Sequence, residues 1–80
     1  MIQLTEFERQ LLETFSLSDR DARRLDRVIQ DLMIVVGMEK SEIFDFMRFG
    51  IEDELEDLKK DYHWERFRIR IQKKLKKQNL

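Results

Sequence analysis

Residues 32–51 have the sequence LMIVVGMEKSEIFDFMRFGI, in which two almost wholly apolar segments flank a short polar turn. The first segment, residues 32–36, is apolar at five successive positions, so a helix that ends there has no polar face. In the second segment, residues 43–51, the only polar side chains are Asp45 and Arg48. Helices with this composition must be covered on more than one side, and this requirement sets the architecture that we expect.

A chain of 80 residues is too small to enclose two such helices by itself. A domain of this size buries only about 60 to 65% of the surface that its unfolded chain exposes. We therefore predict a homodimer or larger oligomer whose interface lies within residues 32–51. The predicted interface residues are Leu32, Met33, Val35, Val36, Ile43, Phe44, Phe46, Met47, Phe49 and Ile51. Alternatively, Phe46 or Phe49 packs beneath the C-terminal helix of the same chain.

The rest of the sequence favours a mainly α protein. It contains no Pro and only two Gly, so it lacks the residues that hairpins and sheets need and permits long helices. We expect a single domain over residues 1–80, built from three to four helices. Thr5 and Glu8 have the spacing of a capping box that opens a short first helix.

Local signals also set the next two helices. Ser18 precedes an acidic first turn and predicts the start of a second helix, which Gly37 ends in the left-handed conformation. Ser41, followed by Glu42, predicts the start of a third helix.

The C-terminal part predicts one long helix. Apolar positions continue in helical phase from Ile51, and if residues 51–78 are continuous they form a rod about 42 Å long at 1.5 Å per residue. Residues 66–72 alternate polar and apolar side chains, which is also strand periodicity. Their Lys-rich, Gly-free surroundings favour helix. We expect a helical core in residues 1–60 and a helical extension in residues 61–80.

Composition excludes several classes of protein. The sequence has 16 basic and 17 acidic residues. This balance excludes both a chain that is basic over its whole surface and an acidic disordered tail. The absence of Cys excludes disulfides, thiolate metal sites and a Cys nucleophile. No apolar run approaches the roughly 18 residues of a membrane span, and the N-terminus lacks the pattern of a signal peptide. A cytoplasmic location is therefore our default expectation.

The sequence contains no persuasive catalytic or metal site. His63 is the only imidazole, and no second His or Cys could complete a common zinc set, so we interpret it as a solvated surface residue. Asp53, Asp57 and Asp61 recur at helical spacing and are interpreted as a solvated acidic face. We expect no enzymatic activity, no cofactor, no metal and no small-molecule substrate.

Charge is distributed unevenly along the chain. Residues 1–60 carry a net charge of −6, whereas residues 61–80 carry +5. The cations of the second part are Arg66, Arg68, Arg70, Lys73, Lys74, Lys76 and Lys77. Such a segment could bind a nucleic-acid backbone by releasing its counterions. Alternatively, it offsets a helix dipole or pairs with the acidic residues 52–57 of a second chain.

The stretch from residue 14 to residue 55 resembles the ribbon-helix-helix family of dimeric DNA-binding regulators. The residues that carry the resemblance are Thr14-Phe15-Ser16-Leu17 as an alternating strand, Arg24-Leu25-Asp26 near the start of a helix, Gly37 as the turn, and Ser41-Glu42-Ile43 opening a second helix. The family's first helix is shorter than the one expected here, and its strand carries Arg, Lys or Gln where this chain has Thr and Ser.

The resemblance implies a short strand at residues 14–18 whose Phe15 and Leu17 face the dimer core. It also implies that Thr14 and Ser16 lie in the DNA major groove and that Ser41 marks a phosphate-binding helix start. A plain helical bundle with residues 14–18 as a loop explains the same residues.

These observations together predict a small, non-enzymatic, dimeric nucleic-acid-binding regulator whose basic C-terminal segment supplies the affinity. The alternative is a helical adaptor or inhibitor that engages another protein and binds no nucleic acid. A third interpretation is a helix that lies on an anionic membrane surface through Trp64, Phe67, Ile71 and the lysines.

Overall fold

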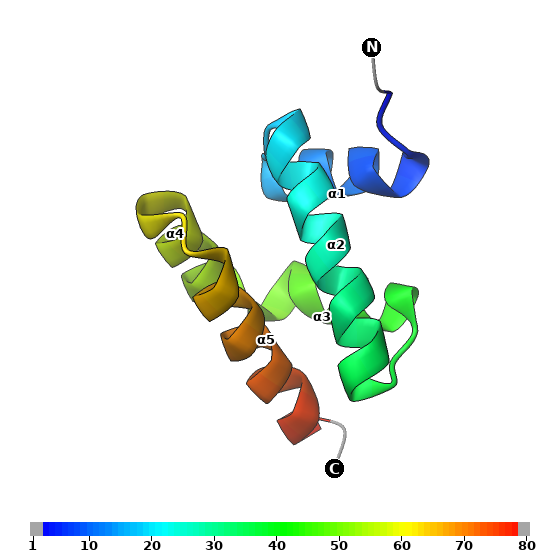
Figure 1. Ribbon diagram of the computed structural model, residues 1–80, viewed down its shortest axis with the longest axis vertical. Helices are drawn as coiled ribbons and strands as arrows, with labels where there is room; N and C mark the ends of the chain where they lie inside the picture. The colour runs from blue at the N-terminus through cyan, green and yellow to red at the C-terminus, as the bar shows by residue number, and fades with distance from the viewer. Residues whose placement is uncertain (1–2, 79–80) are drawn as a thin grey trace.

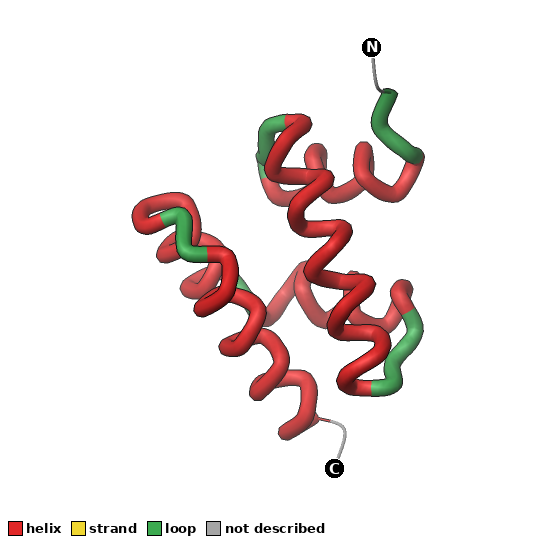
Figure 2. Tube along the Cα trace, viewed as in Figure 1, coloured by secondary structure: helices red, strands yellow, loops and turns green. Residues whose placement is uncertain are grey.

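The chain folds into five α-helices in a computed structural model that describes residues 3–78 (Figure 1). The helices are α1 (Glu6–Phe15), α2 (Asp19–Val36), α3 (Lys40–Gly50), α4 (Glu52–Asp61) and α5 (Trp64–Gln78). Figure 2 shows only helices and loops over the described range, so the prediction of a mainly α fold is confirmed. The number of helices is five rather than the expected three to four.

The predicted ends of α1 and α2 are confirmed in atomic detail. The backbone N–H of Glu8 donates to the Thr5 hydroxyl at 3.1 Å, and the Thr5 N–H donates to the Glu8 carboxylate at 2.8 Å. Ser18 caps α2 by accepting from the Asp21 N–H at 3.2 Å. Gly37 ends α2 with a φ of 75°, a value that glycine adopts without steric cost.

The strand predicted at residues 14–18 is not present, and the start of α3 was placed two residues too late. Thr14 and Phe15 form the last turn of α1, and Ser16 ends that helix in the left-handed conformation with a φ of 55°. A lone strand would have left its backbone groups unpaired, whereas the helix pairs them internally. The cap of α3 is Glu39, whose N–H donates to the Glu42 carboxylate at 3.1 Å, so Ser41 lies within the first turn.

The predicted continuous rod over residues 51–78 is wrong. The chain reverses after α4, where Tyr62 adopts a φ of 56° and its N–H donates to the Leu58 carbonyl at 2.7 Å. His63 then accepts a hydrogen bond at Nδ1 from the Arg66 N–H, at 3.1 Å, in the first turn of α5. The ambiguous residues 66–72 are helical, as expected. Helices α4 and α5 therefore form an antiparallel hairpin (Figure 1).

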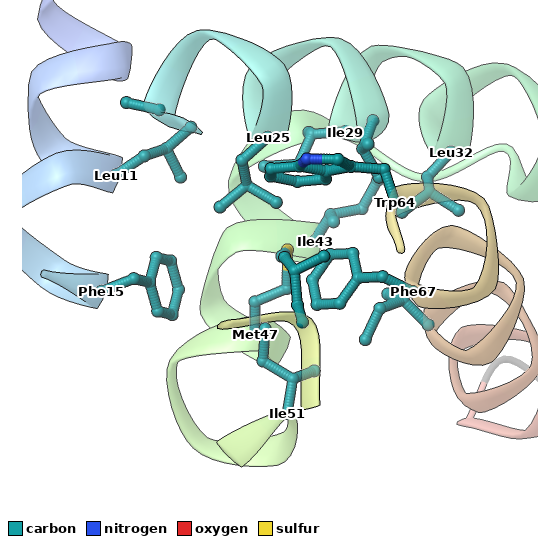
Figure 3. Close-up of a cluster of buried hydrophobic side chains, with 14 of the residues drawn as sticks. Leu11, Phe15, Leu25, Ile29, Leu32, Ile43, Met47, Ile51, Trp64 and Phe67 are labelled. Carbon is teal, nitrogen blue, oxygen red and sulfur yellow. The ribbon is translucent and has the colours of Figure 1, made fainter. Parts of the chain in front are cut away.

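All five helices contribute to a single core, and α5 is an integral part of it. Figure 3 shows much of this cluster, with the indole of Trp64 among side chains of α2. The buried apolar residues are Leu11, Phe15, Ala22, Leu25, Val28, Ile29, Leu32, Ile43, Met47, Ile51, Leu58, Trp64, Phe67, Ile71 and Leu75. Four of them belong to α5, so the described residues 61–78 are part of the core and not an extension beyond it. The membrane-surface interpretation also fails, because it required three of these buried side chains to be exposed.

Most of the predicted dimer interface is buried within its own chain. Leu32, Ile43, Met47 and Ile51 are buried, and Met33, Val36, Phe44 and Phe46 pack partly buried against the core. The expectation that a monomer could not enclose these helices was wrong because α1 and α5 cover what a partner was expected to cover. The ring of Phe44, for example, lies 5.7 Å from that of Phe7 and 6.2 Å from that of Phe15.

Three apolar side chains in the same part of the molecule are exposed. Ile34 is 83% exposed, Phe49 is 75% exposed and Val35 is 47% exposed. The homodimer stays a prediction, and it now rests on these three residues. Phe46 packs partly buried against the core, whereas Phe49 does not.

Candidate functional site

Several of the predicted nucleic-acid-binding cations are engaged by acids of their own chain. Glu54 is only 5% exposed, and its carboxylate lies 2.8 Å from Lys74 Nζ and 3.4 Å from a guanidinium nitrogen of Arg70. Arg70 also binds Asp57 at 2.8 Å, and Lys74 donates to the Gly50 carbonyl at 2.9 Å. Within the acidic residues 52–57, Glu54 and Asp57 thus receive partners from α5 of the same chain, not from a second chain as one interpretation expected.

Two further arginines of α5 are paired with acids that lie close to them in the sequence. Arg68 binds Glu65, and this hydrogen bond and the positive charge lower the pKa of the Glu65 carboxyl. Arg66 lies 3.7 Å from Asp61, an exposed pair of the kind that contributes little to stability. Lys73, Lys76 and Lys77 are exposed and form no ion pair with any of residues 3–78. We call these three residues the terminal lysines.

A second set of cations lies on α2, and the sequence interpretation did not single it out. Arg20, Arg23, Arg24 and Arg27 recur at the spacings of three and four residues that place side chains on one helix face. We call them the arginine row. None of the four forms an ion pair within the described part of the chain. At 1.5 Å per residue the row spans about 10 Å.

The arginine row was missed because α2 is close to neutral as a whole. Its first nine residues, DRDARRLDR, alternate acids and arginines, so a count of charges along the sequence finds no basic segment. The position of each residue around the helix axis is the signal that could have found the row. The four arginines share one face, and the aspartates at positions 19, 21 and 26 lie to either side of it.

The arginine row lines a groove of about 680 Å³, a volume in the range of ligand-binding pockets. The lining residues are Glu8, Arg20, Arg23, Arg24, Asp26, Arg27, Gln30, Tyr62 and Trp64. Four arginines against two acids give this lining a net charge of +2 when both carboxylates are ionised. The groove is therefore suited to an anionic ligand.

Two aromatic residues close the α5 side of the groove. Trp64 is only 8% exposed and forms its wall, and the guanidinium carbon of Arg24 lies 5.9 Å from the centroid of the indole ring. Tyr62 is 48% exposed. Its ring meets Trp64 edge to face at 5.8 Å, and its hydroxyl donates to the Asp21 carboxylate. Tyr62 thus presents an accessible ring in a fixed orientation.

Asp26 moderates the charge of the groove. Burial, together with the nearby carboxylate of Glu8, raises the pKa of Asp26 above its usual value. Gln30 donates to the same carboxylate at 3.2 Å. The groove also contains Arg23, whose Nε is the one buried side-chain nitrogen or oxygen without a hydrogen-bond partner in residues 3–78.

The structure does not bring the other candidate residues to this groove. Thr14, Ser16 and Ser41 are exposed on α1, on the turn after it and on α3, and none of them lines the groove. Among the residues that the structure describes, no three His, Asp or Glu side chains are placed to hold a metal ion. His63, the only imidazole, instead accepts the backbone hydrogen bond that helps to begin α5.

A second groove, of about 520 Å³ and with a mixed apolar and polar lining, lies on α3. It is lined by Met38, Glu42, Asp45, Phe46, Phe49, Gly50 and Gln78. Arg48 lies beside it, with its guanidinium carbon 5.2 Å from the centroid of the Phe49 ring. Phe49, which lines this groove, is the largest exposed apolar side chain of the predicted interface.

Within residues 3–78, no helix combines the length and the apolar character needed to cross a membrane. Comparison of the chain with protein families, with curated proteins and with solved structures found no match.

Proposed function

We propose that this protein is a small non-enzymatic regulator that binds nucleic acid through the groove between α2 and α5. The observation that carries the proposal is the arginine row, four guanidinium groups on one face without an ion pair to any described residue. Other cations of the chain are paired with acids, as Arg70 and Lys74 of α5 are with Glu54 and Asp57 of α4. Unpaired arginines gathered in a groove favour a ligand with several negative charges.

Phosphate groups fit this arrangement better than isolated carboxylates do. Guanidinium groups bind phosphate oxygens through two parallel hydrogen bonds, and a row of them matches a polymer with one phosphate per nucleotide. Neutralising those phosphates releases condensed counterions, which supplies affinity that does not depend on sequence. Base specificity would require further contacts in addition to these.

The C-terminal segment contributes less than its charge of +5 implied. Moving Arg70 or Lys74 to a phosphate would leave the nearly buried Glu54 without its partners, and an unpaired buried carboxylate is costly. The terminal lysines carry no such cost. We therefore assign the affinity jointly to the arginine row, near the start of α2, and to the terminal lysines, near the end of α5 (Figure 1).

The experiment that tests this proposal is a salt titration of binding to labelled DNA and RNA, starting at about 50 mM salt. The double variant Arg20→Gln, Arg27→Gln removes two exposed cations of the row. The logarithmic salt slope should shrink by about 1.4 to 1.8, because each phosphate contact contributes about 0.7 to 0.9.

The matched control is Arg9→Gln, Arg48→Gln, which removes two exposed helical cations that do not line the groove. This control should leave both the affinity at fixed salt and the salt slope close to those of the parent chain. If the intact protein binds neither DNA nor RNA at about 50 mM salt, the proposal fails.

A protein-interaction role is the second candidate, favoured by the exposed Phe49 and the groove that it lines. A second copy of the chain is one such partner. Phe49→Glu should leave the fold intact, because that side chain is 75% exposed. Light scattering at micromolar concentration should then detect a monomer where the parent chain is a dimer. A monomeric parent chain would remove the homodimer prediction.

A further inference from the structure

The two aromatic residues of the groove differ in the exposure of their rings. This difference helps to decide which kind of nucleic acid can bind. Trp64 is buried and cannot accept a base on its face, whereas about half of Tyr62 is exposed. Tyr62 is also held in place at both ends. Its backbone N–H donates to the Leu58 carbonyl and its hydroxyl donates to Asp21. A ring that is exposed and already fixed loses little conformational entropy when a base stacks on it.

The position of Tyr62 beside the arginine row restricts the ligand further. Glu8 of α1 lines one side of the row, and Tyr62 and Trp64 line the other. Arg20, Arg24 and Arg27 are exposed, and the row lies on the face of α2 opposite its buried residues. In a duplex the base faces are stacked on one another and only base edges are open in the grooves. A single strand, in contrast, can lie along the exposed row and place the face of one base on Tyr62.

We propose that the groove binds unpaired nucleotides of single-stranded DNA or RNA, with one base stacked on Tyr62 and neighbouring phosphates held by the arginine row. This inference rests on the proposed nucleic-acid function and makes it more specific. The row spans about 10 Å, which is about three steps of a stacked strand at 3.4 Å per nucleotide and so matches about four successive phosphates. Stacking on an aromatic side chain tolerates any base, so the site would show weak sequence preference.

The protein contains its own reporter for the test. Trp64 is the only tryptophan, and its ring lies 5.8 Å from that of Tyr62. Its fluorescence can be titrated with an unlabelled 12-nucleotide single strand and, separately, with a duplex of the same sequence at about 50 mM salt. The single strand should bind more tightly than the duplex.

Two substitutions isolate the ring of Tyr62. Tyr62→Phe and Tyr62→Leu both remove the hydroxyl that binds Asp21, and only the second removes the ring. Tyr62→Phe should bind the single strand within about twofold of the parent chain. Tyr62→Leu should bind it about 5- to 100-fold more weakly, the loss typical of one stacked base, with an unchanged salt slope.

A second test changes the ligand and uses the parent protein, so its result does not depend on whether either variant folds. A strand with the same phosphates but abasic sugars should bind the parent protein as weakly as the normal strand binds Tyr62→Leu. Equal affinity of the abasic and normal strands, or a preference for the duplex, would overturn this inference. In that case, a loss of binding on substitution of the arginine row would still support the proposed function. Absence of binding to every strand would instead refute the proposed function itself.

Discussion

Helix α2 carries four cations and α5 carries seven, and the two helices use them differently. On α5, Arg70 and Lys74 surround the nearly buried Glu54 and join α4 to α5. On α2, the four arginines of the row have no partner in the described chain and line a groove. The segment with the larger charge is therefore not the segment with the larger number of available cations. Pairing within the fold, more than the charge of a segment, decides which cations can bind a ligand.

The largest expected effect tests whether α5 is structural. Truncation after Glu65 removes Phe67, Ile71 and Leu75 from the core, each of them at most 2% exposed. Burial of one such side chain contributes about 1.5 to 3 kcal/mol, so the loss of three is comparable with the whole stability of a domain of this size. The truncated chain should be unfolded by circular dichroism. If the truncated chain is folded, α5 is a peripheral extension and not a required part of the core.

A smaller effect is expected from breaking the pairing of α4 with α5. Glu54→Gln should lower the free energy of unfolding by about 2 kcal/mol, because it leaves Arg70 and Lys74 without their shared carboxylate. The cost stays below that of a fully buried pair because both cations are partly exposed. Urea denaturation measures this change. The control Glu52→Gln, at an exposed position of the same helix, should change stability by less than about 0.5 kcal/mol.

The smallest effect concerns the groove itself. Asp26→Asn removes a negative charge from its lining and should strengthen nucleic-acid binding about two- to fivefold. The pKa of Asp26 is raised in the folded chain, so protonation of Asp26 favours folding at low pH, and this contribution is lost as the pH rises through the raised pKa. The melting temperature at pH 7 should therefore be equal to or slightly above that of the parent chain. A clear decrease would show that the ionised carboxylate is stabilising.

Features set by a few neighbouring residues could be predicted from the sequence. The capping box of Thr5 and Glu8, the cap at Ser18 and the stop at Gly37 all depend on residues within four positions of each other. The break at Tyr62 could not be predicted in this way. It contains neither Gly nor Pro, and a tyrosine adopts the left-handed conformation there because the apolar face of α5 must return to the core.

The candidate site was predicted only in part, for a related reason. The terminal lysines stand out in the sequence because no acid lies among them. The arginine row is interrupted by aspartates along the chain and becomes a row only on the surface of a helix. The engagement of Arg70 and Lys74 depended on a hairpin that the sequence did not predict.

The most direct test of the central claim measures stability and binding on two double variants. Arg70→Gln, Lys74→Gln removes two cations that hold the fold, and Arg20→Gln, Arg27→Gln removes two that line the groove. We predict that the α5 variant melts at a lower temperature and, while folded, binds single-stranded nucleic acid within about twofold of the parent chain. The α2 variant should keep its melting temperature and lose most of its affinity. The opposite pattern, with binding lost in the α5 variant and retained in the α2 variant, would contradict the account.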